Sequence, residues 1–140
     1  MLDDKDEKRQ NQFRAVIDTF PGVQLVRFVD RIEYEIIGNL EMKLIGRLRK
    51  KGSSNHQIAE WLRPILEEHE VYGDYIFSFE GELWSRPVAL VRLSETFEWL
   101  EPLIETQIRS FVLYFVRPDN KFYLRVAYHE GYLEAEIVEA

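Results

Sequence analysis

The stretch from residue 111 to residue 137, FVLYFVRPDNKFYLRVAYHEGYLEAEI, decides the fold class of this chain. Its first six residues are apolar on both faces of an extended chain, which predicts a strand in the middle of a sheet. After a turn at 117–120, apolar residues alternate with other residues over 122–128, and after a second turn they do so again over 133–137. Strands joined by such short turns pair antiparallel, so this third of the chain predicts an antiparallel sheet.

The segments before this stretch predict helices that alternate with further hairpins. Helical spacing of apolar residues predicts helices over 4–20, 54–72 and 94–108, and SNHQ at 54–57 has the sequence of a helix-capping box. Alternation over 32–36, followed by Gly38-Asn39, predicts a strand and a tight turn. The pattern of residues 40–50 fits both a strand and a helix, and the sequence leaves that choice open. Further strands are predicted over 23–29, 75–79 and 83–93.

Two helical segments resemble each other, WLRPILEEHE at 61–70 and WLEPLIETQI at 99–108. We therefore expect repeated helix–strand–strand units, and the length of 140 residues suits one core. The sequence predicts a single globular α+β domain over 1–140, with a largely antiparallel sheet and three helices packed on one face. The approximate bounds of the units are 4–52, 53–93 and 94–138.

Each of the two segments places a proline inside a predicted helix. Pro64 would remove the hydrogen bond to the carbonyl of Glu60, and Pro102 would remove the bond to the carbonyl of Glu98. Both helices are therefore expected to bend at these points and to wrap a twisted sheet.

The charge distribution indicates the kind of partner. The net charge is −7, and between residues 53 and 105 three arginines stand against eleven acidic residues. Such a segment would attract a basic partner and repel nucleic acid. The basic segment RLRKKGSSNHQIAEWL at 47–62 resembles the start of a helix-turn-helix, but the recognition helix would then be glutamate-rich. We therefore expect no nucleic acid partner.

No motif for catalysis, metal binding or cofactor binding is present. The chain has no cysteine, and His56, His69 and His129 lack the spacing of metal sites. No catalytic residue, no metal and no cofactor are predicted. The polar N-terminus lacks the pattern of a signal peptide, and no apolar run has the length of a membrane span. The expected location is the cytoplasm, without a membrane partner.

These features predict a non-enzymatic binding protein of the immunity, inhibitor, chaperone or adaptor type, which engages a basic protein partner through an acidic, aromatic-bearing surface. One alternative is a small-ligand sensor with a pocket between helices and sheet. A second is an enzyme that uses carboxylates and a histidine. Homodimerisation stays open, because the exposed edge strands of a sheet can pair with those of a second copy. The sequence also leaves open whether Trp61 and Trp99 lie in the core or at the surface. The candidate partner-binding residues are Trp84, Glu67, Glu68, Glu70, Glu98, Glu101, Tyr123 and Tyr132.

Overall fold

The computed structural model of the chain describes residues 4–29, 42–78, 88–106, 111–119 and 121–139. The helices in these ranges are α1 (Asp4–Ile17), α2 (Asn55–Glu68) and α3 (Leu100–Glu105). The strands are β1 (Val23–Phe28), β2 (Lys43–Arg49), β3 (Gly73–Ser78), β4 (Ala89–Leu93), β5 (Val112–Val116), β6 (Phe122–His129) and β7 (Tyr132–Glu139). In these ranges no helix combines the length and the apolar character that crossing a bilayer requires.

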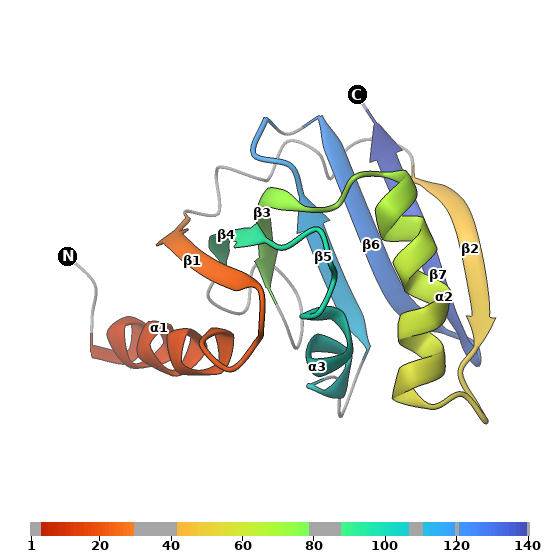
Figure 1. The fold of residues 1–140 in the computed structure, drawn as a ribbon, viewed down its shortest axis with the longest axis horizontal. Helices are drawn as coiled ribbons and strands as arrows, with labels where there is room; N and C mark the ends of the chain where they lie inside the picture. Colours follow the sequence, from red (N-terminus) through yellow and green to blue (C-terminus); the bar gives the residue numbers. More distant parts are fainter. Residues whose placement is uncertain (1–3, 30–41, 79–87, 107–110, 120, 140) are drawn as a thin grey trace.

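The seven strands form one antiparallel sheet in the order β1-β4-β3-β5-β6-β7-β2. The three helices lie against one face of it (Figure 1). The order of elements along the described chain is one helix and two strands, a second helix and two strands, then a third helix and three strands. The predicted α+β class, with an antiparallel sheet and helices on one face, is confirmed.

The stretch that indicated the fold class forms β5, β6 and β7. β5 lies at the centre of the strand order, as its two apolar faces predict. β6 and β7 form a hairpin whose turn residues, Glu130 and Gly131, both have positive φ angles, 49° and 93°. Two positive φ angles are what a two-residue hairpin turn of type I′ requires, and Gly131 adopts its angle without a steric penalty.

The ambiguous segment 40–50 is a strand over Lys43–Arg49. This strand, β2, pairs with β7 at the far end of the sheet from β1. A partner about 90 residues away along the chain cannot be inferred from local periodicity, which explains why the sequence left the choice open. The predicted strand at 32–36 and its turn at Gly38-Asn39 lie outside the described residues.

Aromatic rings fill the space between the helices and the sheet. Phe77 of β3 and Phe115 of β5 stack with ring centroids 6.5 Å apart and an interplanar angle of 7°. Phe13 of α1 packs against Phe77 at 6.3 Å, and Trp99 packs against Phe115 at 5.9 Å. Trp99 is fully buried, and its indole N–H donates a hydrogen bond of 2.9 Å to the carbonyl of Ser94. Trp99 therefore belongs to the core.

The other matched tryptophan, Trp61, is only half-buried and packs against the core from α2. It lies over Gly46 of β2, where an added Cβ would be 3.1 Å from Ile65 Cδ1 and 3.5 Å from Trp61 Cζ2. Glycine at this position lets α2 approach β2 closely. Trp61 lies inside α2, whereas Trp99 precedes α3, so the two residues occupy different places in their segments. The internal repeat stays a prediction.

The two prolines also occupy different places. α2 continues through Pro64 as one helix (Figure 1), and the bend predicted there stays a prediction. α3 begins only at Leu100, so Pro102 lies in its first turn. Backbone N–H groups in a first turn have no helical acceptor, so a proline there costs nothing. The prediction that Pro102 interrupts a helix at Glu98 is wrong, because the helix does not extend back to Glu98.

This difference predicts opposite results for one substitution. Pro64→Ala should raise the free energy of unfolding by up to about 3 kcal/mol, because it restores a helical hydrogen bond to the carbonyl of Glu60. Pro102→Ala, the matched control, should change it by less than about 0.5 kcal/mol. Urea denaturation of both variants measures these values. Equal effects of the two substitutions would contradict the placement of the prolines.

Candidate protein-binding surface

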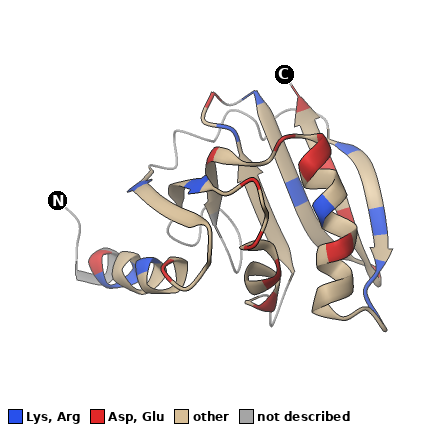
Figure 2. Ribbon diagram, in the orientation of Figure 1, with Lys and Arg blue, Asp and Glu red and all other residues tan. Residues whose placement is uncertain are grey.

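α2 and α3 lie side by side and collect acidic side chains from two separate parts of the chain. Figure 2 shows red segments along both helices and in the loops that flank them. Arg63 is the only lysine or arginine in residues 55–70 and 94–105. We call this surface the acidic face, and its members are Glu60, Glu67, Glu68, Glu70, Glu95, Glu98, Glu101 and Glu105.

The structure brings together the predicted glutamates but not the predicted aromatic residues. Glu67, Glu68, Glu70 and Glu98 are exposed on the acidic face, and Glu101 is half-buried there. Tyr123 and Tyr132 point away from the helices, because they neighbour Leu124 and Leu133, which face the helices in the core. The acidic face therefore does not include these two tyrosines. Trp84 lies outside the described residues.

Tyr72, which the sequence did not single out, supplies an exposed aromatic ring next to the acidic face. Its side chain is 36% exposed, and its ring packs edge-on against Phe97 at 6.3 Å. The guanidinium of Arg63 lies 5.9 Å from the same Phe97 ring. No local signal marked it: Tyr72 ends the helix predicted over 54–72, seven residues after Ile65, and so falls on the apolar side of that predicted helix.

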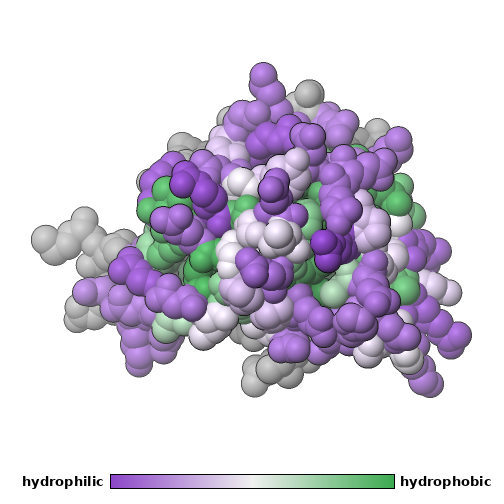
Figure 3. All heavy atoms as spheres, in the orientation of Figure 1, coloured by the Kyte–Doolittle hydropathy of each residue, from purple (hydrophilic) through white to green (hydrophobic). Residues whose placement is uncertain are grey.

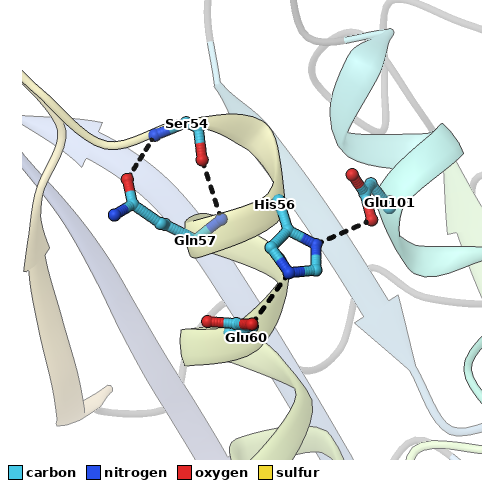
Figure 4. Close-up of polar contacts among 5 residues, drawn as sticks. All are labelled: Ser54, His56, Gln57, Glu60 and Glu101. Atoms are coloured by element: carbon cyan, nitrogen blue, oxygen red, sulfur yellow. Dashed lines mark hydrogen bonds and ion pairs between the residues drawn. The ribbon is translucent and has the colours of Figure 1, made fainter.

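His56 of α2 contacts two carboxylates, one on its own helix and one on α3 (Figure 4). Its Nε2 lies 2.8 Å from Glu60 Oε1, and its Nδ1 lies 3.3 Å from Glu101 Oε2. The hydrogen bond with Glu101, and then the negative charges of Glu60 and Glu101, raise the pKa of His56 above its ordinary value of 6.5. A protonated His56 therefore neutralises part of the acidic face.

A helix-capping box fixes the turn that carries His56. The Ser54 hydroxyl accepts a hydrogen bond of 3.1 Å from the Gln57 backbone N–H, and the Gln57 side chain accepts one of 2.8 Å from the Ser54 N–H (Figure 4). This confirms the capping box predicted at 54–57. The position of His56 at the start of α2 is therefore set by local sequence, whereas its contact with Glu101 depends on the packing of α3.

Among the described residues, no group of three or more histidine, aspartate or glutamate side chains is arranged so that it could hold a metal ion. Of the other histidines, His69 stacks on Phe122 and His129 ends β6. Two open hollows, of about 460 and 480 Å³, lie along α1. The first is lined by α1 alone, and the second lies between the end of α1 and β1, at the edge of the sheet. Figure 3 shows the helix-covered face, on which hydrophilic atoms predominate and hydrophobic atoms emerge between the elements and toward β1.

The His56 bridge predicts a pH dependence with a defined sign. Because the pKa in the folded protein is raised, the bridge stabilises the fold fully below pH 6.5 and loses this contribution as pH rises through the folded pKa. An NMR titration of the imidazole should give a pKa above 6.5 that returns toward 6.5 in Glu101→Gln. Glu105→Gln, on the same helix, should leave the pKa higher than Glu101→Gln does. Identical titrations of the two variants would rule out the contact with Glu101.

Comparison of the chain with protein-family models, curated proteins and solved structures finds no match.

Proposed function

We propose that the protein is a non-enzymatic binding protein whose acidic face docks on a basic surface of a protein partner. One observation carries this proposal: the packing of α2 beside α3 joins eight glutamates from two distant segments, with Arg63 as the only arginine or lysine in those segments. The expected class is an immunity protein, inhibitor, chaperone or adaptor. We further propose a cytoplasmic location, which the lack of cysteine supports.

Binding proceeds in two physical steps. The field of the acidic face steers a basic partner during diffusion, which raises the association rate and makes it sensitive to salt. Tyr72 then provides an aromatic anchor, since aromatic side chains dominate the energetic centres of interfaces. Arg63 is already paired with Glu67 at 2.8 Å, so it opposes an incoming cation less than a free arginine would.

His56 lies between the carboxylates of Glu60 and Glu101, where a cation of the partner would bind. It occupies one oxygen each of Glu60 and Glu101. A lysine or arginine of the partner can replace the imidazole at these carboxylates, and it carries a full charge at every physiological pH. Deprotonation of His56 makes this replacement easier, so binding should strengthen as pH rises above the folded pKa.

The steering step predicts the effect of removing two charges that have no ion pair in the described residues. Glu68→Gln with Glu105→Gln should lower the association rate constant roughly three- to tenfold at low salt, and added salt should remove this difference. The matched control, Glu7→Gln with Asp18→Asn, removes the same charge from α1 and the turn that follows it, and it should have a smaller effect. The partner is first isolated from the source cell on immobilised protein, and surface plasmon resonance then measures the rates. An association rate that is indifferent to salt would refute steering.

The docking step predicts a different kinetic effect for Tyr72→Ala. Loss of the anchor should raise the dissociation rate about tenfold and leave the association rate unchanged. Tyr132→Ala is the matched control, since Tyr132 is 37% exposed, as Tyr72 is 36% exposed, but lies on the other face of the sheet. The same surface plasmon resonance measurement reports both rates. If Tyr132→Ala raised the dissociation rate more than Tyr72→Ala, the partner would bind the face of the sheet opposite the helices.

A further inference from the structure

The face of the sheet opposite the helices carries arginines on β2 and β6, the two strands that flank β7. Arg47 of β2 pairs across strands with Glu134 of β7, with 3.2 Å between Nε and Oε2. Arg125 of β6 pairs across strands with Glu136 of β7, with 3.2 Å between Nη2 and Oε2. Figure 2 shows the same order, with blue segments on β2 and β6 and red segments on β7 between them. We call the residues Arg47, Arg49, Arg125 and Tyr132 the arginine face.

The cations of these pairs lie nearer to solvent than the carboxylates. The Arg47 side chain is 49% exposed and that of Glu134 is 15% exposed; for Arg125 and Glu136 the values are 33% and 21%. Burial raises the pKa of Tyr123, the neighbour of Arg125 on this face, well above its usual range, so its phenol stays neutral. The surface presented to a partner is therefore cationic, although the whole chain is acidic.

Arg47 and Arg49 have N–H donors that can bind an anion. The Arg47 guanidinium lies 4.1 Å from the centroid of the Tyr132 ring, and Tyr132 is the cross-strand neighbour of Arg49. Arg49 is exposed and makes no ion pair with any residue in the described ranges. A guanidinium has five N–H donors, and the pair with Glu134 uses only the Nε of Arg47. Most of the donors of both arginines therefore remain available.

We propose that the arginine face is a second interaction surface, which binds an extended acidic segment of a partner protein. Arg47 and Arg49 project from the same face of β2, two residues and thus about 6.5–7 Å apart. Alternate side chains of an extended peptide have the same spacing, so carboxylates at every second position match the two guanidiniums. Arginine suits this role because its planar group binds a carboxylate through two parallel hydrogen bonds.

The contacts favour a peptide over a single-stranded nucleic acid. Nucleic acid surfaces of this kind need aromatic rings with free faces on which bases stack. Here one face of the Tyr132 ring is covered by Arg47, and Tyr123 is packed against Tyr114 at 5.5 Å. Arginine–carboxylate pairing, in contrast, is already the chemistry of this face. The arginine face lies across the sheet from the acidic face, so this proposal does not depend on the proposed function.

Fluorescence anisotropy with a labelled peptide of alternating glutamate and serine, twelve residues long, tests the proposal. The wild-type protein should bind it saturably at low salt, and Arg47→Gln with Arg49→Gln should raise the Kd about tenfold or more. Arg49→Gln alone leaves the Arg47–Glu134 pair and the Tyr132 contact in place, so it keeps the fold and should raise the Kd roughly threefold. The matched control, Lys8→Gln with Arg9→Gln, removes the same charge from α1 and should leave the Kd within a factor of two of wild type.

Each of the following results would contradict the proposal. The first is the absence of saturable binding, or an equal loss of affinity in the α1 control. The second is tighter, arginine-dependent binding of a twelve-residue oligouridine, which would assign the face to nucleic acid. The third is arginine-dependent self-association in sedimentation measurements, which would identify a second copy of this chain, and not an acidic peptide, as the partner of this face. A peptide with its six glutamates in one block tests the spacing, since binding equal to that of the alternating peptide would contradict the match to β2.

Discussion

The contact of Trp99 and Phe77 with Phe115 is the interaction on which the rest of the structure depends. Phe77 and Phe115 are direct cross-strand neighbours at the centre of the sheet, and Trp99 covers Phe115. A fully buried ring of this size stabilises the fold by about 2–3 kcal/mol. Phe13 extends the layer to α1. These rings hold α1 and the start of α3 against the sheet, and the place of α3 beside α2 follows from that.

The same layer separates the polar residues of the chain into two surfaces. Because the helices bury their apolar stripes against the aromatic rings, their outward sides carry the glutamates of the acidic face. Because strand residues alternate, the sheet presents its other residues, including Arg47 and Arg125, on the opposite side. A net charge of −7 thus conceals a cationic surface. The net charge of the chain describes neither surface, because the sheet separates the acidic face from the arginine face.

Local patterns predicted local structure well. The capping box at Ser54 and the hairpin turn at Glu130 are set by contacts within a few residues, and both are confirmed. The error at Pro102 has a physical cause as well. The segment before it has helical spacing, yet the helix starts only at Leu100, because Trp99 is drawn into the core and Phe97 takes a positive φ of 57°. Tertiary packing there overrides the local preference for a helix.

The sequence by itself determined the α+β class, the antiparallel pairing of β5, β6 and β7 and the glutamate-rich character of α2 and α3, since each follows from spacing or composition over short distances. Only the tertiary structure decided that β2 pairs with β7, that His56 meets Glu101, and that Tyr72 rather than Tyr132 accompanies the glutamates. These results depend on contacts between residues far apart in the chain. A period of two or 3.6 residues says which face a side chain occupies, but not which distant element it faces.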